Sequence, residues 1–368
     1  MTTSPLPTTP EELTPEWLTA ILRKGGYMGA NASVSSIRSE QVGEGIGFIG
    51  LVARLTPAYD GPAGSAPRSI IAKFPSPDPG SRQVGNLYGL YEREVRFYNE
   101  LAKDSGLDVP HCYYAEYDAA AGQSLVMIEE LADGRFGDQV TGCTPEEARL
   151  AIHSLARFHA AWWEHPRLQQ ISWMVTGDAL VRNAVLTAYE LCWPIYAQRF
   201  PQSITPKMEK AGPTLHRRIV AQLDRFAANP LTIAHGDYRP DNMFFGAAGN
   251  PRSLTVFDWQ SPNRGWGAYD LAYFIAGCFD VPTRRKHAGA LVAEYHELLR
   301  EGGVKDYTLE QLTNDYRACT ALMTGIGIIN GAALPTTNQR AVDLFEQMLS
   351  RFNSAIDDVD ALDALPEV

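Results

Sequence analysis

The N-terminal third of the chain alternates short apolar runs with glycine, proline and polar residues, a pattern typical of β-strands joined by turns. A helix precedes these runs, because Thr14-Pro15 is a helix-start signal and Gly25-Gly26 a stop signal. Apolar residues three and four positions apart predict a second helix farther along. The expected elements are a helix over residues 15–24, a strand, glycine-rich turn and strand over 34–55, strands over 67–74, 113–117 and 125–128, and a helix over 87–101.

The remainder of the chain predicts mainly helices. Thr144-Pro145-Glu146-Glu147 carries the full capping-box signal for a long helix. His159 lies on the apolar stripe of that helix, which favours a buried structural role over a catalytic one. Further helices are expected over residues 271–279, 283–300, 308–329 and 338–354, whereas the apolar runs 243–245 and 254–257 are expected to be strands and the acidic tail 357–368 is expected to fray.

A tight polar loop lies between two short apolar runs, and its sequence is His235-Gly236-Asp237-Tyr238-Arg239-Pro240-Asp241-Asn242. Asn242 follows Asp237 by five residues, and another acid, Asp258, lies sixteen residues past Asn242 at the end of the next apolar run. The order H-x-D-x-x-x-x-N followed by D-W or D-F is typical of phosphoryl-transfer enzymes.

This loop carries the side chains that phosphoryl transfer needs, which are groups for positioning and for charge cancellation. Asp237 would accept the proton of an acceptor hydroxyl or hold that hydroxyl in line, and Arg239 would offer a planar cationic donor to the transferring phosphate. Asn242 and Asp258 offer the hard oxygens that Mg²⁺ prefers. The alternative is a polar turn with Asp258 as a loop cap, but such a turn would not need three oxygen-bearing side chains.

A glycine-rich turn over residues 43–50 separates the first two predicted strands. It contains G-x-G-x-x-G at Gly45, Gly47 and Gly50, which would indicate a dinucleotide-binding fold only if a helix followed. A strand-like run over residues 51–55 follows instead. We therefore expect a β-hairpin in which the backbone at Gly45 and Gly47 approaches the phosphates of a nucleotide, and a hairpin without a ligand is the alternative.

Lys73 stands near the end of a predicted strand, where a lysine is commonly a solvated edge residue. Glu94 lies within the apolar stripe of the following helix, and a carboxylate on a buried face is costly unless it is paired. We therefore predict an ion pair between Lys73 and Glu94, with Lys73 binding nucleotide phosphates. The alternative is that Glu94 extends to solvent.

The length of 368 residues is long for one core and suits two lobes. The apolar strand over 125–128 changes into the polar sequence Glu129-Glu130-Leu131-Ala132-Asp133-Gly134, which would form a hinge between the lobes. Backbone groups of Glu129, Glu130 and Leu131 would bind the edge of an adenine. This assignment rests on position, because no side chain there identifies a base.

Composition narrows the classes of function. The net charge of −11 argues against nucleic acid or an anionic membrane as a partner. Five cysteines without a C-x-x-C pair fit reduced thiols rather than a disulfide framework or a zinc site. No secretory leader and no apolar run of membrane-spanning length is found, so a soluble, cytoplasmic protein is expected. The oligomeric state, including a homodimer, stays open.

Five segments together resemble the aminoglycoside phosphotransferase/choline kinase-like superfamily, and most closely its ecdysteroid-kinase-like branch, the bacterial phosphotransferase enzyme family. They are Ile71-Ala72-Lys73, Tyr91-Glu92-Arg93-Glu94-Val95-Arg96-Phe97-Tyr98, the loop from His235 to Asn242, Val256-Phe257-Asp258-Trp259-Gln260 and Gly267-Ala268-Tyr269-Asp270-Leu271-Ala272. The resemblance implies an α+β, protein-kinase-like fold that binds ATP and Mg²⁺. An N-lobe of antiparallel sheet plus helix would cover residues 1–128, the hinge 129–134, and a mostly helical C-lobe 135–368, with the catalytic loop at 233–245.

The resemblance also implies roles for individual residues. In such enzymes the residue that matches Asp237 is the catalytic aspartate, and those that match Asn242 and Asp258 hold metal. The match at Asp270 braces the backbone of the catalytic loop, and we assign His235 to the same structural support. Trp259-Gln260 stands where protein kinases have Phe-Gly, and an A-P-E segment is missing, so a small-molecule acceptor is favoured over a protein.

The predicted activity is transfer of the γ-phosphoryl group of ATP to a hydroxyl of a small molecule. An aminoglycoside would call for a cluster of carboxylates in the helical insert over residues 173–229, which contains only Asp178, Glu190, Glu209 and Asp224. This sparse supply favours a neutral or partly apolar alcohol. A nucleotide-binding, pseudokinase-like regulator is the alternative. Such a regulator need not retain every site residue, so it is disfavoured by the complete set Lys73, Glu94, Asp237, Asn242 and Asp258. A protein kinase is less favoured still.

Overall fold

The computed structural model describes residues 6–43, 50–333 and 339–368, and its chain divides into two compact units. The first unit comprises Met1–Asp104, Asp108–Asp133 and Val256–Ser261, and the second Ser105–Leu107, Gly134–Thr255 and Pro262–Val368. The chain leaves the first unit after Asp133, inside the segment that we expected to be a hinge, and the hinge role itself stays a prediction. Val256–Ser261 belongs to the first unit, although we expected this segment in the C-lobe.

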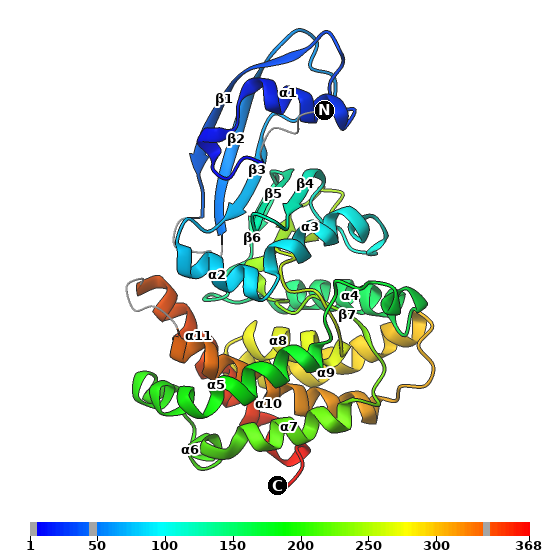
Figure 1. Cartoon of the computed structure of the whole chain (residues 1–368). Helices are drawn as coiled ribbons and strands as arrows, with labels where there is room; N and C mark the ends of the chain where they lie inside the picture. The colour runs from blue at the N-terminus through cyan, green and yellow to red at the C-terminus, as the bar shows by residue number, and fades with distance from the viewer. Residues whose placement is uncertain (1–5, 44–49, 334–338) are drawn as a thin grey trace. The chain divides into compact units, whose positions relative to one another are not determined.

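The first unit is built on a five-stranded antiparallel sheet in the order β1-β2-β3-β5-β4 (Figure 1). Its strands are β1 (Ser33–Gln41), β2 (Gly50–Asp60), β3 (Ile70–Pro75), β4 (Cys112–Asp118) and β5 (Gln123–Glu129). In the central strand β3, Ile70, Ala72 and Phe74 are buried. Because side chains alternate along a strand, Lys73 points to the other face of the sheet.

The helices of the first unit confirm one prediction and correct another. Helix α1 (Pro15–Lys24) has the predicted bounds, with Thr14 as its N-cap. The single helix expected over residues 87–101 is wrong, since the structure has α2 (Pro79–Leu87) and α3 (Leu90–Glu100) there. Gly89 lies between them with a φ of 63°, a left-handed conformation that interrupts helix geometry and that glycine adopts readily.

The core of the first unit lies between the sheet and α1. It contains Leu18 and Leu22 of the helix and the buried side chains of the central strands, which are Ala53, Leu55, Ile70, Ala72, Phe74, Leu125 and Met127. These residues occupy alternate positions in each strand, so one face of the sheet is covered by apolar packing. The Lys73 side chain therefore lies on the face of β3 that is opposite this core.

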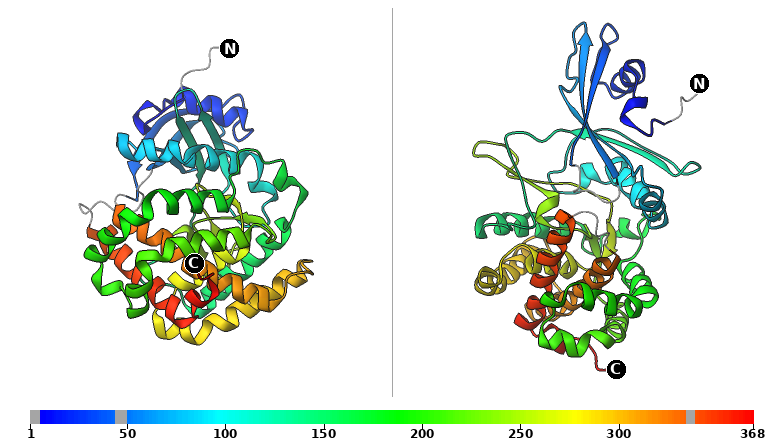
Figure 2. Two further views of the ribbon diagram at one scale, coloured as in Figure 1. Left: turned by 60° about the horizontal axis from the view of Figure 1, so that its bottom comes forward. Right: turned by 90° about the vertical axis from the view of Figure 1, so that its left-hand side faces the viewer.

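The second unit is mainly helical (Figure 2). Its helices are α4 (Pro145–Trp162), α5 (Gly177–Arg199), α6 (Pro206–Ala211), α7 (Leu215–Phe226), α8 (Gly267–Gly277), α9 (Val281–Glu301), α10 (Leu309–Ala333) and α11 (Gln339–Asp358). The predicted capping box at Thr144 and Glu147 is confirmed. Two small sheets accompany the helices, ordered β6-β8-β9 and β10-β7, from β6 (Gly134–Phe136), β7 (Thr232–Ala234), β8 (Met243–Gly246), β9 (Leu254–Val256) and β10 (Asn263–Gly265).

Helix α10 is the central element of the second unit and packs against α5, α7, α8 and α11. Apolar and small residues lie on most of its faces, which is typical of a helix buried on all sides. Gly325 shows how close this packing is, because a Cβ there would come within 2.4 Å of Cδ1 of Ile219. A core of this kind provides a rigid support for α8, the helix that carries Asp270.

The C-terminal tail does not fray as expected. Residues Ala361–Ala364 form a 3₁₀ turn, and Leu365 is buried. Arg218 of α7 donates hydrogen bonds to the carbonyl oxygens of Leu362, Leu365 and Pro366 at 2.5–2.9 Å. The acidic sequence was a misleading signal, because Arg218, which is distant in the sequence, binds the backbone carbonyls of the tail and holds it in place.

The architecture confirms the predicted class, an α+β fold with an N-terminal antiparallel sheet and a mostly helical C-terminal part. Over the residues that the structure describes, no helix is both long and apolar enough to cross a bilayer.

Candidate active site

In the first unit, one ammonium group lies between two carboxylates. Lys73 Nζ is 2.6 Å from Asp258 Oδ1 and 3.0 Å from Glu94 Oε2. The side chains of Lys73 and Glu94 are largely buried, whereas that of Asp258 is 32% exposed. The ion pair predicted between Lys73 and Glu94 is confirmed, and Asp258 joins it although 185 residues separate Asp258 from Lys73.

Asp258 reaches this cluster because the segment around it is packed against α3. The indole of Trp259 stacks on the ring of Phe97 with centroids 3.8 Å apart and planes inclined by 4°. Asp258 itself has a φ of 63°, which is uncommon for a residue other than glycine. Such a conformation costs of order 1–3 kcal/mol and persists only where its surroundings fix it.

The charges of the cluster shift the pKa values of Lys73 and Glu94. Burial alone would lower the pKa of the Lys73 ammonium, but the charges of Asp258 and Glu94 outweigh burial and raise it. Burial and the charge of Asp258 raise the pKa of the Glu94 carboxyl, although Lys73 opposes them. Two carboxylates around one ammonium leave surplus negative charge when both are ionised, which suits a further cation.

The segment after β5 is held by side chains of its own unit. Glu130 accepts hydrogen bonds from Arg54 Nε and Ser69 Oγ, each at 2.6 Å. Glu129 Oε1 accepts the N–H of His111 at 2.7 Å, and the N–H of Glu129 donates to the His111 carbonyl at 2.8 Å. The two carboxylates therefore fix this segment, and nucleotide contact by the backbone of Glu129, Glu130 and Leu131 stays a prediction.

The glycine-rich turn is described only at its ends. Gly45 and Gly47, which we expected to bind nucleotide, lie outside the described residues. Gly50 begins β2, and a Cβ there would lie 3.0 Å from the Phe74 carbonyl oxygen and 3.7 Å from Lys73 Cε. A side chain at position 50 would thus press on the Phe74 carbonyl and touch the Lys73 side chain at ordinary contact distance.

The second unit holds the predicted catalytic loop between β7 and β8. Asp237 is the centre of its polar contacts: Asn242 Nδ2 donates to Asp237 Oδ2 at 2.8 Å, and Arg239 Nε lies 3.1 and 3.2 Å from its two oxygens. Tyr273 of α8 donates a further hydrogen bond to this carboxylate. The Asp237 side chain is 30% exposed, so it is held firmly and still accessible.

Asp270 of α8 holds the backbone of the same loop. Its two carboxylate oxygens accept the N–H groups of His235, at 2.6 Å, and Gly236, at 3.0 Å. His235 Nδ1 then accepts the N–H of Asp237 at 3.2 Å. His159 is fully buried, with Nε2 3.3 Å from Asp270 Oδ2. His159 therefore helps to hold Asp270, which supports the loop, and this agrees with the structural role predicted for it.

Asp237 is set up to be ionised. Burial alone would raise the pKa of its carboxyl, but the Arg239 charge and the hydrogen bonds from Tyr273 and Asn242 outweigh burial and lower it. The carboxylate in turn raises the pKa of Arg239 against the effect of burial. At neutral pH the loop therefore presents a carboxylate fixed by a guanidinium, a phenol and an amide.

Two members of this loop environment were not predicted. Asp241 accepts a hydrogen bond from Arg239, and Tyr273 donates to Asp237. Asp241 lies inside the loop that the sequence singled out, but the sequence did not show that it would bind Arg239 and Gln139. Tyr273 lies three residues after Asp270 on one helix, a spacing that places two side chains on the same face and could have indicated it.

Each unit by itself offers a hard donor of the kind that Mg²⁺ prefers. Asn242 uses its amide nitrogen on Asp237, which leaves its carbonyl oxygen as the group suited to a metal. Asp258 contacts Lys73 through Oδ1 and keeps a second carboxylate oxygen. Within the described ranges, no cluster of three or more His, Cys, Asp or Glu side chains could hold a metal by itself. Amide and carboxylate oxygens of this kind suit Mg²⁺, which completes its shell with water and phosphate oxygens.

The fold is that of the aminoglycoside phosphotransferase-like kinases. A sequence profile of the ecdysteroid kinase-like family matches residues 44–306, and the chain belongs to this family. It is therefore a member of a family of small-molecule phosphotransferases. The search of curated proteins found no match.

Solved structures agree on the fold at low sequence identity. A candidate aminoglycoside phosphotransferase from Ralstonia eutropha matches with a TM-score of 0.56 and 18% identity, over 96% of this chain and 99% of that one. The GDP and kanamycin complex of APH(2″)-IIIa matches with a TM-score of 0.54 and 15% identity, over 93% and 99%. The amicoumacin kinase hAmiN, in complex with AMP-PNP, Ca²⁺ and Ami, matches with a TM-score of 0.51 and 11% identity, over 90% and 92%. A choline kinase from Cryptosporidium parvum matches with a TM-score of 0.52 and 12% identity, over 95% and 96%.

Proposed function

We propose that the protein is an ATP-dependent kinase that transfers the γ-phosphoryl group to a hydroxyl of a small molecule. The observation that carries the proposal is the Lys73 ammonium between Glu94 and Asp258, at 3.0 and 2.6 Å. A buried lysine with two carboxylates is costly as mere structure and fits the binding of a metal-bound polyphosphate. Family membership and the occurrence of AMP-PNP in a structure of the same fold support it.

The proposed reaction gives each predicted site residue a role. Lys73 would bind phosphate oxygens, and the oxygens of Asp258 and Asn242 are the groups that would hold Mg²⁺. Bound Mg²⁺ would neutralise charge on the phosphates. Asp237 holds the acceptor hydroxyl, whose oxygen bonds to the γ-phosphorus as the bond to the β-phosphate oxygen breaks and ADP leaves. The hydroxyl proton passes to Asp237.

The lowered pKa of Asp237 shapes this role. A carboxylate stabilised by Arg239, Tyr273 and Asn242 is a weak base. Phosphoryl transfer through a loose transition state needs little help from a base before the P–O bond breaks. Asp237 therefore acts chiefly by orienting the hydroxyl, and it takes up the proton late. Contact of Arg239 with the transferring phosphate stays a prediction, because Arg239 pairs with Asp237 and Asp241.

The acceptor that we propose is a neutral or partly apolar alcohol. Of the four acids in residues 173–229, Asp178 and Asp224 both pair with Arg182, at 2.9 Å each. Glu190 pairs with His216 at 3.0 Å. Two of the four acids thus share one guanidinium and a third contacts an imidazole, so they do not form the cluster of unpaired carboxylates that a polycationic aminoglycoside calls for.

A nucleotide-binding regulator is the alternative function. It would bind Mg²⁺-ATP without transferring phosphate, and it would not need the contacts of Asp237 with Asn242 and Tyr273. A screen for acceptor-dependent ADP release over alcohols, sugars, sterols and aminoglycosides tests the proposal. Release that depends on one hydroxylated compound supports a kinase, whereas nucleotide binding without any acceptor-dependent release supports the regulator.

A further inference from the structure

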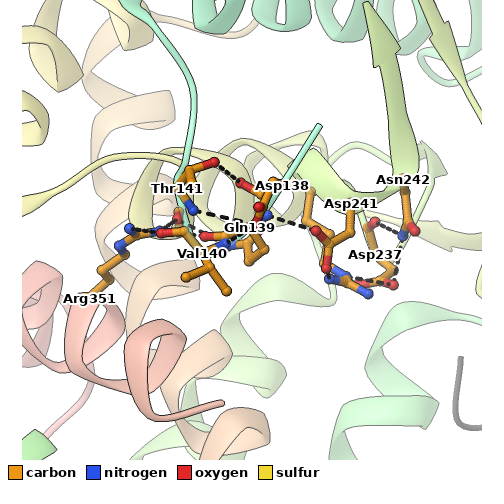
Figure 3. A network of polar contacts seen from close by, with 10 residues as sticks. Asp138, Gln139, Val140, Thr141, Asp237, Asp241, Asn242 and Arg351 are labelled. Atoms are coloured by element: carbon orange, nitrogen blue, oxygen red, sulfur yellow. Dashed lines mark hydrogen bonds and ion pairs between the residues drawn. The ribbon is translucent and has the colours of Figure 1, made fainter. Parts of the chain in front are cut away.

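The catalytic loop is joined to a second loop by Asp241 (Figure 3). One oxygen of this carboxylate accepts the N–H of Gln139 at 2.7 Å. The other accepts a hydrogen bond from Arg239, which also pairs with Asp237 through Nε. Asp241 therefore links the guanidinium beside Asp237 to the backbone of residues 138–141.

Arg351 of α11 holds that second loop from its other side (Figure 3). Its Nη1 donates to the carbonyl oxygen of Gln139 at 2.6 Å, and its Nη2 to that of Val140 at 2.7 Å. Only 7% of Arg351 is exposed. Within the described part of the chain no carboxylate forms an ion pair with Arg351, so its charge is met by backbone carbonyl dipoles.

Arg351 also contacts the helix that supports the catalytic loop. Its Nη1 donates to the carbonyl oxygen of Gly277 at 2.9 Å, and Gln139 Nε2 donates to the same oxygen at 3.0 Å. Gly277 ends α8, where a cation is favoured by the helix dipole. The same helix supplies Asp270 to the loop backbone and Tyr273 to Asp237. Asp237 is thus supported by residues 138–141, through Asp241 and Arg239, and by α8. The Arg351 guanidinium contacts both of these supports.

We propose that Arg351 is a positioning residue, which keeps Arg239 and Asp237 in their working geometry by fixing residues 138–141 and the end of α8. It touches no reacting atom. A buried cation without an ion-pair partner is a costly way to stabilise a fold, whereas a planar fork that bridges three carbonyls gives defined geometry. The link to catalysis rests on the proposed function, but the geometric coupling does not.

Arg218 provides a matched control for this proposal. It also donates to three backbone carbonyls, those of Leu362, Leu365 and Pro366, and it is part of the same unit. Its contacts lie in the C-terminal tail, and among the described residues it forms no hydrogen bond to residues 138–141 or to α8. Replacement of either arginine could loosen the unit in general, whereas only replacement of Arg351 should displace Arg239.

The test is the Nε–H signal of Arg239 in protein labelled with ¹⁵N-arginine, assigned by its loss in Arg239→Lys. In Arg351→Met we expect this signal to shift and its hydrogen exchange to accelerate about ten-fold or more, while Arg218→Met leaves both unchanged. If the methionine variant does not fold, Arg351→Lys takes its place. Lysine keeps the positive charge but lacks the planar guanidinium, so we expect the same changes in the Arg239 signal. An unchanged Arg239 signal, or an equal change in the Arg218 variant, would overturn the proposal.

A second measurement connects the coupling to catalysis. With an acceptor found, Arg351→Met should lower kcat by about 10- to 100-fold, the scale of a reacting group displaced by an ångström, with little change in the KM for Mg²⁺-ATP. An unchanged kcat would refute the positioning role. A wild-type protein that transfers no phosphate refutes the proposed kinase instead, while the Arg239 signal still decides the coupling.

Discussion

The indole of Trp259 lies parallel to the ring of Phe97, with centroids 3.8 Å apart, and this stack fixes the neighbouring Asp258 beside Lys73. Trp259 is fully buried, and its Nε1 donates to the Val256 carbonyl at 3.2 Å. In the position where protein kinases have a phenylalanine, the chain thus carries a larger ring that anchors the segment of Asp258 to α3.

Replacement of Trp259 tests this anchor. Trp259→Ala should lower the free energy of unfolding by about 3–5 kcal/mol, the usual cost of deleting a buried large aromatic side chain. It should also weaken stabilisation by Mg²⁺-ATP, because Asp258 loses its fixed position. Trp259→Phe keeps a ring to stack on Phe97 and serves as the control. Urea unfolding with and without Mg²⁺-ATP measures both effects, and equal nucleotide stabilisation in all three proteins would contradict the anchoring role.

Asp270 should be required for the stability of the catalytic loop. Asp270→Asn keeps one acceptor oxygen and so leaves one of the N–H groups of His235 and Gly236 unpaired. An unpaired buried donor costs about 1–3 kcal/mol, and chemical denaturation should show a loss of that size. Asp306→Asn, at an exposed position of the same unit, is the matched control. If the two variants are equally stable, Asp270 does not brace the loop.

The lowered pKa of Asp237 predicts a pH dependence of stability. A carboxyl whose folded-state pKa lies below its unfolded value of about 3.9 stabilises the fold above that value, and this contribution is lost as the pH falls toward the folded-state pKa. Between about pH 5 and pH 3, the unfolding free energy of the wild type should therefore fall more steeply than that of Asp237→Asn. Denaturation at a series of pH values measures both slopes, and parallel slopes would show that Asp237 is not stabilised as an anion.

Lys73 and the metal should both be needed for nucleotide binding. A ligand at one hundred times its Kd stabilises a protein by about 2.7 kcal/mol, so Mg²⁺-ATP should raise the Tm of the wild type clearly. We expect Lys73→Met to lose most of this shift and EDTA to reduce it. Lys103→Met changes an exposed lysine of the same unit and should keep it. A full shift in EDTA would argue against Asp258 and Asn242 as metal ligands.

Local signals in the sequence predicted much of the fold. The cap of α1, the capping box of α4 and the apolar stripe that contains Glu94 each depend on residues within a few positions of one another. The pair of Lys73 and Glu94 followed because a carboxylate on a buried face needs a partner. These predictions succeeded where the physical cause is local or where burial restricts the choice of partner.

The features that escaped prediction depend on contacts between distant residues. The helix break at Gly89 was overlooked because apolar spacing continues across it. The tail was expected to fray because nothing near it in sequence shows that Arg218, 144 residues away from Leu362, binds its carbonyls. Arg351 contacts Gln139 across 212 residues, and no local pattern distinguishes it from a solvated arginine.

The most direct test of the central claim is acceptor-dependent ADP release by the wild type and by Asp237→Asn, followed by ³¹P NMR of the product. We predict that at least one small hydroxylated compound increases ADP release by the wild type and appears as a phosphate ester. Asp237→Asn should bind Mg²⁺-ATP nearly as well and form no ester. Ester formation at a wild-type rate by Asp237→Asn, or Mg²⁺-ATP binding with no productive acceptor in the library, would contradict this account.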